Sequence, residues 1–127
     1  MTSLRASCEA VLKANDRGAY TIPSPKLYPH QWAWDSAFAA IGWATIDAKR
    51  AWLELETLLA GQWDDGRIPH IYFHILSDDY FPGPDFWQTE RSSSITQPPV
   101  WATCARAVAE ITGDVSPAKA LLSRIDA

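Results

Sequence analysis

The sequence predicts an all-α fold in which antiparallel helices form part of an α/α toroid. Five segments carry apolar residues at the three- and four-residue spacing of amphipathic helices. Of the four connections between them, two are long and rich in aromatic residues and proline, and two are short turns. Because antiparallel neighbours connect at alternate ends, this order gathers both long connections at one end, where loops on a rigid scaffold form binding sites.

The first helix is expected over residues 3–15, and its apolar residues share one face: Leu4, Cys8, Val11 and Leu12. The turn-forming residues that follow end it, and the three prolines of residues 19–33 predict a loop. The two cysteines, Cys8 and Cys104, both lie inside helical patterns. We therefore expect two buried free thiols in place of a disulfide.

The second and third helices are expected to follow each other with almost no linker. The second begins at residue 34 or 35 and runs to about residue 46, with Phe38 facing the core. Asp47 is predicted to cap the third, which ends near residue 61. Trp43 and Trp52 lie within these helical patterns and are predicted to be core residues.

Residues 63–96 form the second long connection, with a candidate extended piece at residues 71–76. A loop of this length is uncommon unless it is functional. Burial of its large apolar side chains would hold it against the helices. We expect Phe81, Phe86 and Trp87 to be buried in this way.

Two more helices are expected after this loop. The fourth begins at Pro98 or Pro99, because proline suits the first turn, and ends at Gly113. The fifth begins at Ser116 and continues to the last residues without a glycine or asparagine cap. We therefore expect residues 1–127 to be a fragment of something larger.

Composition and motifs exclude several classes of function. The net charge of −4 argues against nucleic-acid binding, which would show as a basic stripe. The most apolar stretch, residues 37–46, is far shorter than the ~18 residues that span a bilayer. With no apolar signal-peptide core and only two cysteines, a cytoplasmic location is expected. Zinc, nucleophile-elbow and phosphate-loop motifs are missing from the sequence, so no metal or cofactor is predicted.

The first long loop ends in an unusual cluster of aromatic and acidic residues. Trp32, Trp34 and Asp35 follow Tyr28 within eight positions, at the expected start of a helix. Aromatic rings pack against the C–H face of a sugar, and a carboxylate accepts strong hydrogen bonds from two hydroxyls. The cluster predicts a carbohydrate site. The alternative is that Asp35 only caps the helix while the two tryptophans fill the core.

The second long loop carries two further candidates. Tyr80 and Gln97 have polar ends, and Gln97 lies just before the fourth helix. Its amide offers one donor group and one acceptor to neighbouring hydroxyls. His70 and His74 are four residues apart in the same loop, but no helical zinc motif surrounds them, and we expect both to serve in loop packing.

Four stretches occur in the order YPHQWAWDSAFAAIGWA, GRIPHIYF, YFPGPDFW and SITQPPVWA. Together they resemble glycoside hydrolase family 63, in particular its mannosylglycerate and glucosylglycerate hydrolases. The resemblance implies an (α/α)6 barrel of the six-hairpin glycosidase type, of which five helices are less than half. Residues 1–127 would then be the truncated N-terminal part of that single domain. It also implies inverting hydrolysis of the α-glycosidic bond of a small carbohydrate substrate, with no cofactor.

The same resemblance assigns roles to the candidate residues. Tyr28, Trp32, Trp34 and Asp35 match positions that line the pocket for the sugar ring. Tyr80 matches a loop tyrosine near the aglycone, and Gln97 matches a glutamine that helps to hold the sugar. The acid and base that the resemblance implies fall beyond residue 127. An inverting site needs both carboxyl groups, ~6.5–9.5 Å apart, so this chain is expected to carry part of the pocket and no catalytic residue.

Two other functions remain open at this point. A sugar epimerase or isomerase on a helical toroid would use histidines as acid and base, and His30, His70 and His74 are available. A non-catalytic carbohydrate-binding helical module would bind a sugar without cleaving it. The sequence leaves open which sugar and aglycone are bound, and also the oligomeric state.

Overall fold

The computed structural model describes residues 3–125 of the chain, and helices dominate it. The elements, in order, are α1 (Leu4–Asn15), β1 (Gln31–Trp32), α2 (Ala33–Ala44), α3 (Ala48–Leu59), β2 (Ile71–Tyr72), α4 (Pro84–Trp87), α5 (Trp101–Thr112) and α6 (Ser116–Ile125). All five predicted helices are present, as α1, α2, α3, α5 and α6. The four-residue helix α4 and the pairing of β1 with β2 were not predicted.

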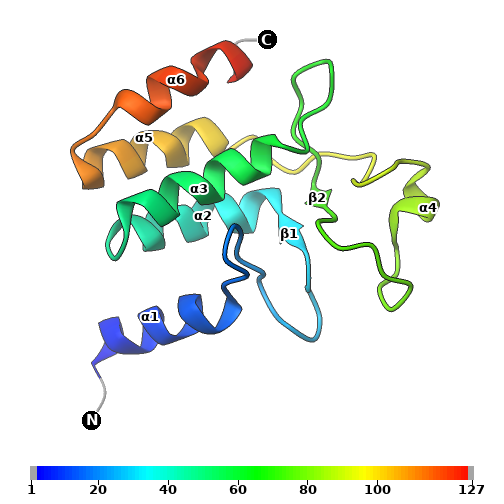
Figure 1. Cartoon of the computed structure of the whole chain (residues 1–127), viewed down its shortest axis with the longest axis horizontal. Coiled ribbons are helices and arrows are strands. Elements are labelled where there is room, and N and C mark those ends of the chain that lie inside the picture. Colours follow the sequence, from blue (N-terminus) through cyan, green and yellow to red (C-terminus); the bar gives the residue numbers. More distant parts are fainter. Residues whose placement is uncertain (1–2, 126–127) are drawn as a thin grey trace.

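Helix α2 lies at the centre of the arrangement. It packs against α3 and α5, which also contact each other, while α1 contacts α2 and α6 contacts α5. The short turns α2–α3 and α5–α6 lie at one end of the helices, and the two long connections lie at the other (Figure 1). The predicted segregation of long loops to one end is confirmed.

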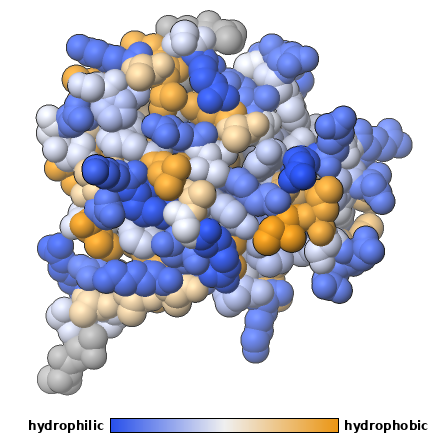
Figure 2. Space-filling view, in the orientation of Figure 1, coloured by the Kyte–Doolittle hydropathy of each residue, from blue (hydrophilic) through white to orange (hydrophobic). Residues whose placement is uncertain are grey.

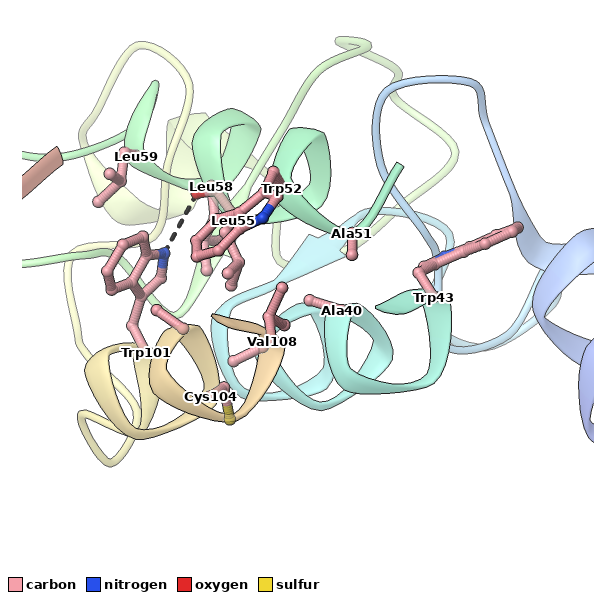
Figure 3. Close-up of a cluster of buried hydrophobic side chains, with 12 residues drawn as sticks. Ala40, Trp43, Ala51, Trp52, Leu55, Leu58, Leu59, Trp101, Cys104 and Val108 are labelled. Carbon is pink, nitrogen blue, oxygen red and sulfur yellow. Dashed lines mark hydrogen bonds between the residues drawn. The ribbon is translucent and has the colours of Figure 1, made fainter. Parts of the chain in front are cut away.

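The core lies between α2, α3 and α5 (Figure 3). Small side chains on α2, among them Ala37 and Ala40, allow the neighbouring helices to approach closely. The indole N–H of Trp101 donates a hydrogen bond to the backbone carbonyl of Leu55 at 3.1 Å. The predicted core positions are confirmed for three side chains, which are 4%, 6% and 1% exposed: Trp43, Trp52 and Cys104.

The apolar face of α1 is mostly uncovered. Leu4 is 82% exposed, Val11 is 60% exposed, and Cys8 is also exposed, so the prediction of two buried thiols is wrong for Cys8. Leu12 is the residue of this face that packs against the core cluster. It approaches α2 at Gly42, where an added Cβ would lie 2.9 Å from a Leu12 methyl carbon.

Two predictions about helix faces and boundaries are also wrong. Phe38 is 48% exposed, because the core face of α2 runs through the alanines and Phe38 lies beside Trp34 at a ring-centroid distance of 5.9 Å. Helix α5 begins at Trp101, two or three residues later than the prolines indicated. The Val100 N–H bonds the Pro98 carbonyl at 2.8 Å, which makes a tight turn ahead of the helix.

The second long loop returns to the helices through β2. Strands β1 and β2 pair in antiparallel register, with Gln31 opposite Tyr72 and Trp32 opposite Ile71, which confirms an extended piece at residues 71–72. Ile71 and Phe73, each 1% exposed, hold the loop down.

Two of the expected buried anchors of this loop lie on its surface. Phe81 is 78% exposed and Phe86 is 57% exposed, because these rings pack on each other and on Trp87 and not on the helices. Apolar patches therefore interrupt the polar surface of the molecule, including the surface on its long-loop side (Figure 2). Across residues 3–125, every helix is too short or too polar to cross a membrane.

Candidate functional site

The amino-terminal ends of α2 and α5 lie together at the long-loop end of the helices (Figure 1). The first turn of any helix leaves backbone N–H groups without partners. Helix α2 has Trp32 at its N-cap, which supplies no side-chain hydrogen bond. Gln97, from the loop before α5, takes this role because its Oε1 accepts the Trp34 N–H at 2.8 Å. Gln97 therefore joins the two long loops and keeps its amide N–H groups as donors.

An aromatic cluster surrounds Trp32. The rings of Tyr28, Tyr80 and His70 meet the indole edge-to-face, at centroid distances of 5.4, 5.8 and 6.3 Å. This geometry is favourable for aromatic pairs. The structure thus brings together three of the predicted site residues: Tyr28, Trp32 and Tyr80.

The aromatic residues differ in how much of the ring a ligand can reach. Trp32 is only 5% exposed, so the alternative that it fills the interior is correct for this residue. Tyr28 and Trp34 are 49% and 41% exposed, which leaves ring surface open. The rings that a sugar can stack on are therefore these two.

Asp35 lies in the first turn of α2, two residues after the first helical position, and is exposed to solvent. The N-cap is Trp32 and not Asp35, so the alternative that Asp35 only caps the helix does not describe this residue. Partial loss of water around it raises the pKa of its carboxyl, while its own backbone N–H and the nearby His70 act in the opposite direction. The carboxylate is therefore accessible and close to His70.

His70, which the sequence assigned to loop packing, lies beside the candidate residues. Its ring lies between Trp32 and Trp87, and burial lowers its pKa although Asp35 opposes this shift. Its Nδ1 is buried without a hydrogen-bond partner, and such an atom calls for an explanation such as a bound ligand. The pairing of β1 with β2 brings His70 beside Trp32, because it aligns two segments that are far apart in the sequence.

The other two histidines are held inside the protein. His74 stacks on Tyr20 at a centroid distance of 3.9 Å and hydrogen-bonds Gln31 Oε1 at 2.7 Å. Burial, with smaller effects of Arg91 and His30, lowers the pKa of His74 to about 4. His30 is 6% exposed and packs against Phe73 and Tyr80. The prediction of loop packing agrees with this geometry for His74.

The predicted residues do not share one cavity among the described residues. Gln97 lines a cavity of about 370 Å³ together with Trp101 and Arg67. Trp34 and Asp35 line a groove of about 430 Å³ between α1 and α2. Tyr80 lines a third cavity of about 660 Å³ in the long loop. The candidate residues named here therefore line three separate hollows.

The described residues 3–125 also show no group of three or more histidine, cysteine or acidic side chains placed to hold a metal ion. Arg67 is already paired: its guanidinium bonds Asp65 at 2.6 Å and lies over the ring of Trp63. The start of α2 and the Trp32 cluster thus offer aromatic surface, the exposed carboxylate of Asp35 and neutral hydrogen-bonding groups.

Comparison with known proteins gives a consistent result. Residues 28–127 match the family described as the mannosylglycerate hydrolase MGH1-like glycoside hydrolase domain. A mannosylglycerate hydrolase from Thermus thermophilus is 56% identical over 102 residues, which cover 76% of this chain and 25% of the relative. A glucosylglycerate hydrolase from Mycolicibacterium hassiacum is 45% identical over 119 residues, which cover 86% of this chain and 27% of the relative.

A solved structure shows the same fold. The crystal structure of a family 63 mannosylglycerate hydrolase from Thermus thermophilus, in complex with Tris and D-glycerate, superposes with a TM-score of 0.89 and 48% identity. The match covers 97% of this chain and 31% of that one. The helices described above are therefore part of a helical toroid, and the chain spans about a quarter of the length of its curated relatives.

Proposed function

We propose, because this chain belongs to the mannosylglycerate hydrolase MGH1-like glycoside hydrolase family, that the whole protein hydrolyses the α-glycosidic bond of glucosylglycerate or mannosylglycerate. Relatives named for each activity are 45% and 56% identical to this chain. The observation within the chain that best supports the proposal is the hydrogen bond from the Trp34 N–H to Gln97. It places the amide of Gln97, from the second long loop, at the helix end that carries the exposed Asp35.

In this proposal, residues 1–127 supply part of the pocket for the sugar ring. The exposed faces of Tyr28 and Trp34 stack on the ring, and Trp32 packs edge-to-face against Tyr28. The Asp35 carboxylate accepts hydrogen bonds from two sugar hydroxyls, which are strong because the acceptor is charged. The free N–H groups of Gln97 donate to a third hydroxyl, and Tyr80 lies towards the aglycone.

The two carboxyl groups of the inverting reaction are proposed to come from residues outside this chain. One protonates the leaving oxygen while the other activates a water on the opposite face of the sugar. Asp35 is assigned to the sugar hydroxyls. Glu54 is fully buried and accepts hydrogen bonds from several neighbours, so it has no access to a water or a glycosidic oxygen.

The proposal is tested by incubating the protein, as its gene encodes it, with glucosylglycerate and with mannosylglycerate. Proton NMR follows the release of glycerate and the anomeric form of the hexose. We expect release from at least one substrate, with the β-anomer formed first because an inverting enzyme acts on an α-glycoside. A hexose whose stereochemistry changes elsewhere in the ring would favour an epimerase. Binding without release would favour a carbohydrate-binding module.

A further inference from the structure

A fully buried carboxylate lies behind the candidate site, on α3. Glu54 is 0% exposed, and its two oxygens accept five hydrogen bonds. Thr21 donates twice, through its backbone N–H at 3.0 Å and its hydroxyl at 2.7 Å. Three further donors bond the carboxylate at 3.3, 2.5 and 2.8 Å: Gln31 Nε2, Ser36 Oγ and Arg50 Nη2. With so many donors around it, the carboxylate is fixed in place.

Two of these donors flank the proposed sugar-binding segment. Gln31 immediately precedes Trp32, and Ser36 immediately follows Asp35. Both are 0% exposed, so neither is free to take another orientation in solvent. One carboxylate on α3 therefore holds both ends of the segment formed by residues 32–35.

The amide of Gln31 is held on both sides. Its Nε2 also donates to the backbone carbonyl of Glu54 at 3.2 Å, and its Oε1 bonds His74 at 2.7 Å. The ring of His74 is in turn stacked on Tyr20. The hydrogen bonds thus continue from α3 through β1 into the second long loop, which carries Tyr80.

The negative charge of Glu54 is compensated from the other side. Arg50, 8% exposed, bonds Glu54 at 2.8 Å and Asp16 at 2.9 Å. A buried charge without a partner is strongly unfavourable, but a compensated buried pair adds little net stability relative to apolar side chains of similar size. Its clearer physical effect is to fix the orientation of the groups that it bonds.

We propose that Glu54 is a positioning residue that sets the placement of the sugar-binding segment, residues 32–35, for glycoside recognition. This inference rests on the proposed function. Glu54 acts through Gln31 and Ser36 and does not touch the sugar. A displacement of about 1 Å at a binding group can reduce activity by about a hundredfold. Because the segment binds the sugar before and during the reaction, its loosening raises KM and leaves kcat nearly unchanged.

The test compares variants of the protein as its gene encodes it. Glu54→Gln keeps the size of the side chain but replaces one acceptor oxygen with a donor, and we expect KM to rise about tenfold while kcat stays within about twofold. Ser36→Ala removes a single bond, and we expect a smaller increase in the same direction. Hydrogen–deuterium exchange should become faster at residues 31–36 in both variants, because the bonds that hold this segment are lost.

Val108→Ala is the matched control. Val108 is 0% exposed in the core of α5, and its truncation lowers Tm without removing a bond to the segment. We expect its KM and the exchange of residues 31–36 to equal those of the wild type. This control separates loss of stability from loss of position.

The proposal is overturned if Glu54→Gln and Ser36→Ala lower Tm but leave KM and the exchange at residues 31–36 unchanged. If Glu54→Gln does not fold, Ser36→Ala decides on the same two readouts. If the wild-type protein hydrolyses neither glycoside, the proposed function fails. The exchange comparison then decides by itself whether Glu54 holds the segment.

Discussion

Asp35 is the acid on which the proposed sugar contact depends, and its protonation state follows from its surroundings. Partial burial raises its pKa above the ordinary value of 3.8, with His70 and its own backbone N–H limiting the shift. Only the ionised carboxylate accepts two hydroxyl hydrogen bonds without also donating. Affinity for the glycoside is therefore expected to be full at neutral pH and to fall as the pH drops through this raised pKa.

Substitution of Asp35 tests its role without a change of shape. Asp35→Asn removes the charge, and loss of charge-assisted hydrogen bonds of about 1.5–3 kcal/mol corresponds to a decrease in kcat/KM of about ten- to a hundredfold. Steady-state kinetics on the glycoside that the wild type hydrolyses measure the effect. Asp114→Asn is the control, because Asp114 lies in the α5–α6 turn at the opposite end and should leave kcat/KM unchanged.

His74 is expected to make stability depend on pH. Its pKa is about 4 in the folded protein and 6.5 as the ordinary value, so the folded state favours the neutral ring. The contribution of His74 to the free energy of unfolding is fully present above pH 6.5. It is lost as the pH drops from 6.5 to about 4, because the unfolded chain takes up the proton first. Thermal unfolding across this range should show a smaller loss of Tm for His74→Gln than for the wild type. An equal loss in both would contradict the assignment.

Individual residues show what a sequence can and cannot predict. Trp43 and Trp52 were predicted as core because they lie within helical patterns, and they are buried because their helices have partners on that side. Cys8 and Phe38 also lie in apolar helical patterns, but both are exposed in the described chain. Periodicity identifies an apolar face, whereas the presence of a partner depends on tertiary contacts.

At the scale of elements, the start of α2 is stabilised from another part of the chain. Gln97 accepts the Trp34 N–H, as an N-cap side chain of α2 itself would otherwise do. A lost cap costs about 1 kcal/mol. The stability of α2 and the geometry of the candidate site therefore depend on the same side chain.

Two substitutions of Gln97 separate these contributions. Gln97→Leu removes acceptor and donor, and we expect a loss of about 1 kcal/mol in unfolding free energy together with weaker glycoside binding. Gln97→Glu keeps an acceptor for Trp34 but loses the donor, and we expect near-normal stability with weaker binding. Chemical denaturation and steady-state kinetics provide the two measurements. Equal stability of both variants would argue against the capping role.

The helices were predictable because their determinants are local. Asp47 bonds the N–H groups of Lys49 and Arg50, as expected for a cap, and the apolar spacing identified the rest. The β1–β2 pair was not predictable, since two-residue strands show no alternation and their partners lie about forty positions apart. The start of α5 was misplaced because two consecutive prolines fit a turn as well as a first helical turn.

At the scale of the whole molecule, the described residues form one side of a toroid with α2 between α3 and α5. Leu55 lies at the junction of these three helices and is 0% exposed. We expect Leu55→Ala to lower the free energy of unfolding by about 2–5 kcal/mol, because a cavity remains where the side chain was. Denaturant unfolding measures this, and a loss below about 1 kcal/mol would show that the packing is looser than described.

The gathering of the long loops at one end was predictable from the connections, but the geometry of the candidate site was not. Alternating long and short links place both long loops at one end, and the structure confirms this. The contacts between Gln97 and Trp34, and between His70 and Trp32, join residues that are 63 and 38 positions apart. No local pattern encodes such pairs, because they depend on how β2 returns the second loop to the helices.

The most direct test of this account is a crystal structure of the protein, as its gene encodes it, with the hexose product and glycerate bound. We predict that the Asp35 carboxylate accepts hydrogen bonds from two hydroxyls of the hexose while a Gln97 N–H donates to another, beside the ring of Trp34. A hexose bound elsewhere, with Asp35 and Gln97 contacting only solvent and protein, would contradict the account.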